Sequence, residues 1–155
     1  MVPDRRIRTQ WWVDGFGVLK PPDGRELPVI DSASATGIDG VSLGGNMALR
    51  AGFRHPDRFG AVASLQGALN PTQIDELVSQ AKAARHKNPE LALRIATSKD
   101  DAFVNSNHAL SRALTAAGVE HSFENHLGPH DYVWNRGPGS YELLLFHDSA
   151  LSHKS

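Results

Sequence analysis

The chain has 155 residues, which suits one domain with a sizeable core, and its 16 lysines and arginines nearly balance its 17 aspartates and glutamates. This balance, without a basic stripe or a polybasic block, argues against nucleic-acid partners and against binding to a membrane surface. The absence of cysteine excludes disulfides and thiol catalysis.

No apolar run approaches the length of a membrane span. The charged N-terminal residues are not followed by the apolar stretch of a signal peptide. We therefore expect a cytoplasmic protein. A secreted protein whose signal peptide has been removed is the alternative.

The first 36 residues predict little regular structure. The run 10–13 contains Trp11 and Trp12 and is typical of a short strand, and 14–17 is a turn signal. Prolines and glycines interrupt residues 21–28, and a small polar stretch occupies 32–36. We treat residues 1–36 as a shortened N-terminal segment and 37–155 as the core of one domain.

From residue 37 the sequence alternates between strand and helix patterns. The predicted strands are 37–41, 59–65, 91–96 and 119–127, and the predicted helices are 45–54, 71–85, 105–117 and 141–151. The run 59–65 is almost entirely apolar, as in a parallel strand covered on both faces. The alternation predicts an α/β fold, a mostly parallel sheet with helices on both faces.

Local signals mark the ends of two of these helices. Asn70 followed by Pro71 predicts a helix start. Asn105 or Ser106 is the expected N-cap of the next helix, and Gly118 is its expected end.

The segment Gly-Val-Ser-Leu-Gly at 40–44 joins the first core strand to a helix. A serine at the apex of a sharp strand-to-helix turn, with glycine two residues either side, is the pattern of a nucleophile elbow. We expect a strained backbone at Ser42 and a close crossing at which a Cβ on Gly40 or Gly44 would collide. The alternative is a glycine-rich turn with a solvated serine.

A serine nucleophile needs a general base, and the base needs a carboxylate, in the chain order Ser, Asp, His. Asp100 and Asp101 follow the third predicted strand, and the residues alone do not decide which of them is the catalytic acid. The alternative is that both simply belong to a turn that leads into the next helix, where aspartate is common. His130 is the base candidate, because it lies in a Gly-Pro-His-Asp turn after the last strand.

The remaining histidines have plainer interpretations. His126 falls within the last strand and His121 near its start, and the others lie on helix ends or faces where we expect solvation: His55, His86, His108, His147 and His153. His126, His130 and Asp131 could be considered as metal ligands, because two histidines four residues apart lie on the same face of a helix. No helix is predicted there, which disfavours a metal site. We expect no metal and no cofactor.

An oxyanion needs two N–H donors. The N–H of Leu43, just after the serine, is one candidate. The other would come from a loop after an earlier strand, and only 11–16 is available, with Phe16 as donor. A β-hairpin at 14–15 is the alternative for that loop.

Taken together, these motifs resemble the Putative esterase group of α/β-hydrolases, which includes enterochelin esterases, esterase D (S-formylglutathione hydrolase) and the mycolyltransferases. The resemblance covers about 26–150 and is carried by the runs at 37–45, 55–62, 98–101 and 128–134. It implies a Ser-His-Asp triad of Ser42, His130 and Asp101. Asp101 is favoured over Asp100 because the family's acid is followed six residues later by an asparagine, here Asn107.

The resemblance also implies that 12–15 corresponds to the end of the family's third strand, whose loop contributes to the oxyanion hole. Family members carry more strands and helices before the elbow than the 41 residues available here. We therefore expect an abbreviated hydrolase in which strand 37–41 lies near a sheet edge. It would be either a homo-oligomer in which a partner covers this edge or a marginally stable monomer.

The expected function is a serine esterase acting on small carboxylic esters through an acyl-enzyme. An acyltransferase of the same family, or a non-catalytic remnant or assembly module, is the alternative. A nucleotide-binding module is disfavoured because no G-x-G-x-x-G follows a strand. Tyr132 and Trp134 lie near His130 in sequence and would line a substrate pocket or pack in the core.

Overall fold

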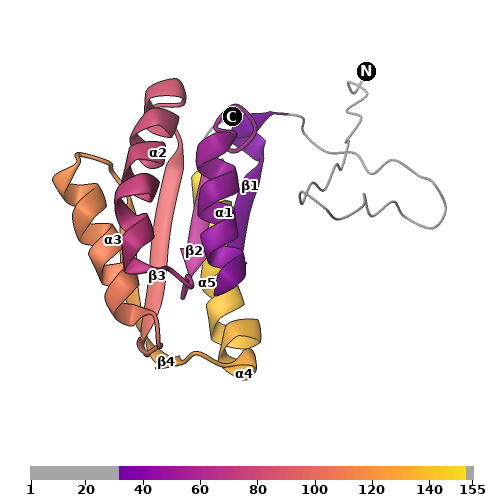
Figure 1. Ribbon diagram of the computed structural model, residues 1–155. Helices are drawn as coiled ribbons and strands as arrows, with labels where there is room; N and C mark the ends of the chain where they lie inside the picture. Colours follow the sequence, from indigo (N-terminus) through magenta and orange to yellow (C-terminus); the bar gives the residue numbers. More distant parts are fainter. Residues whose placement is uncertain (1–31, 153–155) are drawn as a thin grey trace, which may run out of the picture. The chain divides into compact units, whose positions relative to one another are not determined.

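A computed structural model describes residues 32–152 of the chain. Four parallel strands form one sheet in the order β1-β2-β3-β4 (Figure 1). They are β1 (Gly37–Val41), β2 (Ala61–Leu65), β3 (Ala92–Asp100) and β4 (Ser122–Pro129). The helices are α1 (Leu43–Arg54), α2 (Ile74–Lys87), α3 (Val104–Ala116), α4 (Tyr132–Trp134) and α5 (Ser140–Ser152), with 3-10 turns η1 (Ala33–Ala35) and η2 (Pro71–Gln73) and a π-helical turn η3 (Asn135–Gly139). The predicted α/β class is confirmed.

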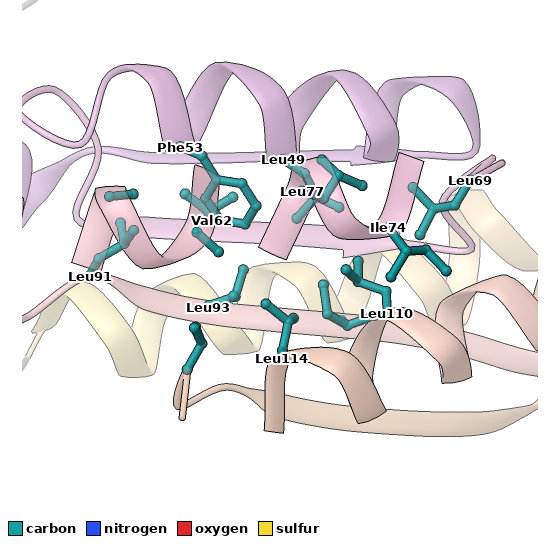
Figure 2. Close-up of a cluster of buried hydrophobic side chains, with 14 residues drawn as sticks. Leu49, Phe53, Val62, Leu69, Ile74, Leu77, Leu91, Leu93, Leu110 and Leu114 are labelled. Atoms are coloured by element: carbon teal, nitrogen blue, oxygen red, sulfur yellow. The ribbon is translucent and has the colours of Figure 1, made fainter. Parts of the chain in front are cut away.

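Helices cover both faces of the sheet. Neighbouring helices α1, α2 and α3 pack on one face, and α5 packs on the other (Figure 1). Strand β2 is buried at every position, which confirms the coverage that its apolar run predicts. The larger core lies between α1–α3 and the sheet and is built mostly from aliphatic side chains, among them Leu49, Val62, Leu77, Leu93 and Leu110 (Figure 2).

Two predicted helix signals are present in the structure. The Asn70 side chain accepts from Thr72 N at 3.0 Å, and Gln73 completes a capping box before α2. Gly118 has φ 70° just after α3, the left-handed conformation typical of a helix end.

The start of α3 differs from the prediction. It begins at Val104, and its N-cap is Phe103 with no side-chain cap, so Asn105 and Ser106 lie inside the first turn. The N–H of Phe103, at the start of α3, instead donates a hydrogen bond to the carboxylate of Asp101 at 2.9 Å. Asp101, upstream of the predicted caps, therefore supplies an acceptor for a backbone N–H at this helix start.

The ends of β3 and β4 also differ from the prediction. Strand β3 continues to Asp100 and β4 continues to Pro129, because the two strands pair beyond the predicted boundaries. A shift in register between Ser98 and Asp100 interrupts their ladder. Helical structure then resumes at Tyr132, eight residues before α5, although Gly137, Pro138 and Gly139 suggest a loop.

Strand β1 is the first strand of the sheet and pairs with β2. Within residues 32–152 no strand pairs with its other side. This agrees with the edge position expected for 37–41. The strand and the loop expected at 10–16 lie outside the described residues. None of the helices in the described part of the chain combines the length and the apolar character needed to cross a bilayer.

Candidate active site

The turn between β1 and α1 has the geometry of a nucleophile elbow. Ser42 has φ 57° and ψ −121°, a conformation that L-residues other than glycine rarely adopt. Its N–H donates to Leu65 O at 2.9 Å, and its carbonyl accepts from Ala68 N at 2.9 Å and from Asn46 N at 3.2 Å. Hydrogen bonds from β2 and the segment after it therefore hold the strained backbone.

Close packing explains only part of the glycine pattern. A Cβ on Gly40 would collide with the carbonyl group of Gly44, as expected. At Gly44 itself the expectation is wrong, because a Cβ there would have no atom within 4 Å. The second tight position is Gly45, whose Cβ would lie 2.6 Å from Ser64 Oγ. The first turn of α1 directs Gly45, and not Gly44, toward β2.

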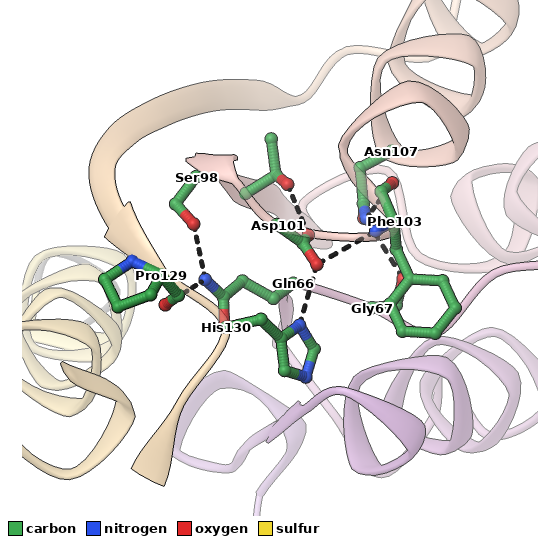
Figure 3. Close-up of polar contacts among 9 residues, drawn as sticks. Gln66, Gly67, Ser98, Asp101, Phe103, Asn107, Pro129 and His130 are labelled. Atoms are coloured by element: carbon green, nitrogen blue, oxygen red, sulfur yellow. Dashed lines mark hydrogen bonds and ion pairs between the residues drawn. The ribbon is translucent and has the colours of Figure 1, made fainter. Parts of the chain in front are cut away.

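Asp101 lies just beyond the carboxyl end of β3, and its side chain is inaccessible to solvent. Its carboxylate accepts three hydrogen bonds, from His130 Nδ1 at 2.7 Å, Thr97 Oγ1 at 2.7 Å and Phe103 N at 2.9 Å (Figure 3). Three donors on one buried carboxylate fix its orientation and satisfy its oxygens.

The structure places Asp101, and not Asp100, against the histidine. Asp100 is the last residue of β3 and is exposed. The next residue turns inward and contacts His130.

His130 directly follows β4, and its side chain is about three-quarters buried. Its ring makes a T-shaped contact with the Phe103 ring, at 5.7 Å between centroids. Because Asp101 can only accept at Nδ1 when ionised, the neutral ring carries its proton on Nδ1. Nε2 is then left with a free lone pair, as a general base requires. Within the described residues no hydrogen bond joins Ser42 Oγ to His130. Such bonds are often long in unliganded enzymes and shorten when substrate binds.

Leu43 is the first residue of α1, so its N–H has no partner within the helix and points out of the helix N-terminus. It is therefore available as the first oxyanion donor. The second expected donor, Phe16, lies outside the described residues. Leu43 is 65% exposed and Met47 is 46% exposed, so the start of α1 presents apolar residues to solvent just after the serine.

His108, His121 and His147 have polar partners, whereas His55 and His86 are exposed as expected. His121 precedes β4 and bonds Ser111 Oγ at 2.8 Å and Val119 O at 2.9 Å. His147 is not solvated as expected, because its ring lies 2.9 Å from Asp39 Oδ2 with 15% of the side chain exposed. His126 lies within β4 as expected, with its ring near that of Trp134. Across residues 32–152 no group of three or more His, Asp or Glu side chains is arranged to hold a metal ion.

Thr97 and Gln66 have no obvious sequence signal, whereas Asn107 is indicated through the family resemblance. Thr97 and Asn107 are fully buried, and Asn107 Nδ2 donates to Gly67 O at 3.0 Å and Phe103 O at 2.9 Å. Gln66 has φ 48° and is also fully buried. Its contacts lie 32 and 63 residues away along the chain, so no local pattern reveals them.

The family model described as Putative esterase matches residues 25–136, which is more than half of the chain. The chain belongs to this esterase family. The match spans the elbow, Asp101 and His130. No curated protein sequence matches the chain.

Solved structures of esterases and of a serine hydrolase share the fold of this family member. A ferulic acid esterase is 23% identical, with a TM-score of 0.67 over 80% of this chain and 55% of its own. The enterobactin esterase of Shigella flexneri, solved in the presence of 2,3-di-hydroxy-N-benzoyl-serine, is 28% identical, with a TM-score of 0.64 over 81% of this chain and 34% of its own. The fluorophosphonate-binding serine hydrolase F of Staphylococcus aureus is 18% identical, with a TM-score of 0.66 over 78% of this chain and 57% of its own. The chain thus spans between about a third and just over half the length of these structures.

Proposed function

We propose that this chain is a serine esterase that hydrolyses small carboxylic esters through an acyl-enzyme. The observation that carries the proposal is the 2.7 Å hydrogen bond from His130 to the buried Asp101, at the same end of the parallel sheet as the strained Ser42. The carboxyl ends of parallel strands are where α/β folds bind ligands.

Each residue has a defined task in the proposed reaction. Ser42 Oγ attacks the ester carbonyl, and Nε2 of His130 takes its proton and delivers it to the leaving alkoxide. Asp101 holds the ring and stabilises the imidazolium. The N–H of Leu43 donates to the oxyanion. A water molecule, deprotonated by His130, then attacks the acyl-enzyme, which releases the acid and the serine.

The alternative to an active esterase is a non-catalytic assembly module, which would keep the fold and the pairing of Asp101 with His130 without hydrolysing esters. An acyltransferase would share every residue of the proposed triad and differ only in accepting an alcohol instead of water.

Labelling with a fluorophosphonate probe tests the proposal, because the probe reacts with a serine only where a base activates it. We expect wild type to be labelled and to hydrolyse p-nitrophenyl acetate, and Ser42→Ala to do neither. Ser140→Ala, which changes a hydroxyl at the start of α5, is the matched control and should behave as wild type. A wild-type protein that is folded but neither labelled nor active would favour the assembly module.

A further inference from the structure

Gln66 shares an unusual feature with the serine of the elbow. Among residues 32–152, only Ser42 and Gln66 are non-glycine residues with positive φ, at 57° and 48°. Such a conformation is unfavourable for residues other than glycine, because the Cβ lies too close to the following carbonyl oxygen. Strained positions of this kind persist where the surrounding structure enforces them, and they cluster at functional sites.

The side chain of Gln66 bridges the ends of two strands. It is inaccessible to solvent, and its Nε2 donates to Ser98 Oγ at 2.5 Å and to Pro129 O at 3.1 Å (Figure 3). Ser98 lies in β3 and Pro129 ends β4, and Pro129 immediately precedes His130. The peptide carbonyl of Pro129 can only accept, so the amide must direct its NH₂ group there.

This bridge lies where the ladder between β3 and β4 is irregular. Ser98 pairs with His126, but Asp100 pairs with Pro129, so β4 carries an extra residue in this interval. Such a bulge interrupts backbone pairing and re-aims the side chains that follow it. Regular strand pairing is therefore weakest just before His130, and the Gln66 amide joins the two strands there.

We infer that Gln66 is a positioning residue that fixes the backbone before His130. The fixed backbone directs the His130 ring toward Asp101 on one side and toward Ser42 on the other. This role rests on the proposed esterase function. Gln66 does not contact the reacting atoms. Gln66 acts through the Pro129 carbonyl. Its own backbone is anchored to β3, because Gln66 N donates to Ala96 O at 2.7 Å.

The test replaces Gln66 by methionine, which has similar size and no N–H donor. In p-nitrophenyl acetate hydrolysis we expect Gln66→Met to lower kcat by about 10- to 100-fold with KM changed less than twofold, because a misplaced base weakens the transition state and not substrate binding. Gln80→Met, in which a glutamine of α2 loses its hydrogen bond to Glu76, is the matched control and should keep wild-type kcat. Ser98→Ala should also keep most activity, because the Pro129 contact remains.

Proton NMR gives a readout that does not depend on activity. The Nδ1 proton of His130, hydrogen-bonded to a carboxylate at 2.7 Å, should give a far-downfield resonance in wild type. This resonance should broaden or move upfield in Gln66→Met and stay in place in Gln80→Met. If Gln66→Met does not fold, Gln66→Asn replaces it, because its amide is one methylene too short to reach Pro129.

A folded Gln66→Met or Gln66→Asn protein with an unshifted His130 resonance and wild-type kcat overturns the inference. If wild type is neither labelled nor active, the proposed esterase fails. The NMR comparison then still decides whether Gln66 positions His130.

Discussion

At the scale of single residues, the choice between two adjacent aspartates decides how the site works. Asp101 is buried against His130, and Asp100 is exposed at the end of β3. Replacing each aspartate by asparagine therefore tests whether Asp101 has the proposed catalytic role, and the exposed Asp100 serves as the control.

We predict that Asp101→Asn lowers kcat by about 10³- to 10⁴-fold, because an amide no longer selects the Nδ1-protonated ring or stabilises the imidazolium. Asp100→Asn should change kcat less than about twofold, because its carboxylate is solvated. Steady-state kinetics on both variants, with circular dichroism to check folding, measures this. Equal losses at both positions would contradict the assignment.

The sequence indicated Ser42 and His130 through local signals, a glycine-flanked serine between strand and helix and a histidine in a Gly-Pro turn. It did not separate Asp100 from Asp101 without the family resemblance, because the choice depends on how the chain turns after β3. It gave no sign of Gln66, whose role depends on a left-handed backbone and on contacts with two distant strands.

At the scale of secondary-structure elements, the crossing of β1 and α1 imposes opposite demands on two glycines. A Cβ on Gly40 would collide with the Gly44 carbonyl, whereas a Cβ on Gly44 would enter open space within the described structure. Glycine is therefore required for packing at only one of these two positions.

We predict that Gly40→Ala lowers the free energy of unfolding by about 1–3 kcal/mol, because the strand and the helix must move apart. Gly44→Ala should raise it by about 0.5–1 kcal/mol, because alanine favours a helix more than glycine does. Urea denaturation of both variants checks the opposite signs. A Gly40→Ala protein as stable as wild type would show that the crossing is looser than the structure indicates.

A salt bridge joins α1 to α2. The hydrogen bond and the positive charge of the Arg50 guanidinium lower the pKa of Glu76 below its ordinary value of 4.5. A carboxyl whose pKa is lower in the folded than in the unfolded state stabilises the fold at any pH above its unfolded-state pKa. This contribution is lost as the pH falls through the folded-state pKa. Glu76 is exposed, so solvent screens the effect.

We therefore predict that Glu76→Gln melts slightly below wild type at about pH 7 and that this difference disappears as the pH falls below the lowered folded pKa, where wild-type Glu76 is protonated. Thermal melts across this range measure it. Glu124→Gln, which removes an exposed carboxylate of β4, serves as the control and should show no such convergence. A difference that stays constant with pH would show that the salt bridge is not its cause.

The element pattern was predictable because local forces produce it: an apolar run for β2, a capping box before α2 and a left-handed glycine after α3. The boundaries were less predictable because tertiary contacts set them. Strand β3 extends to Asp100 because β4 pairs with it, and α3 starts early beside the Asp101 carboxylate.

At the scale of the whole molecule, the sheet edge at β1 and the outer face of α5 bear on assembly. Within residues 32–152 no strand lies beyond β1, and α5 exposes the apolar side chains of Tyr141, Leu144 and Leu145. Exposed apolar side chains that gather on one helix are typical of surfaces that bind other proteins.

We keep the prediction that a second copy of the chain covers the β1 edge. Size-exclusion chromatography with light scattering should give at least a dimer that dissociates on dilution. Leu144→Glu and Leu145→Glu should weaken it if α5 takes part. A wild-type monomer at every concentration would contradict the prediction.

The order of the strands in the sheet is the order in which a ribosome makes them. Each new strand can dock on the one just completed, so the sheet can grow as the chain emerges, without waiting for a distant partner. The proposed nucleophile is made first and the histidine last, and the bond between Asp101 and His130 forms only once β4 is in place. A nascent chain would therefore carry an unactivated serine until β4, the last of the four described strands, has joined the sheet.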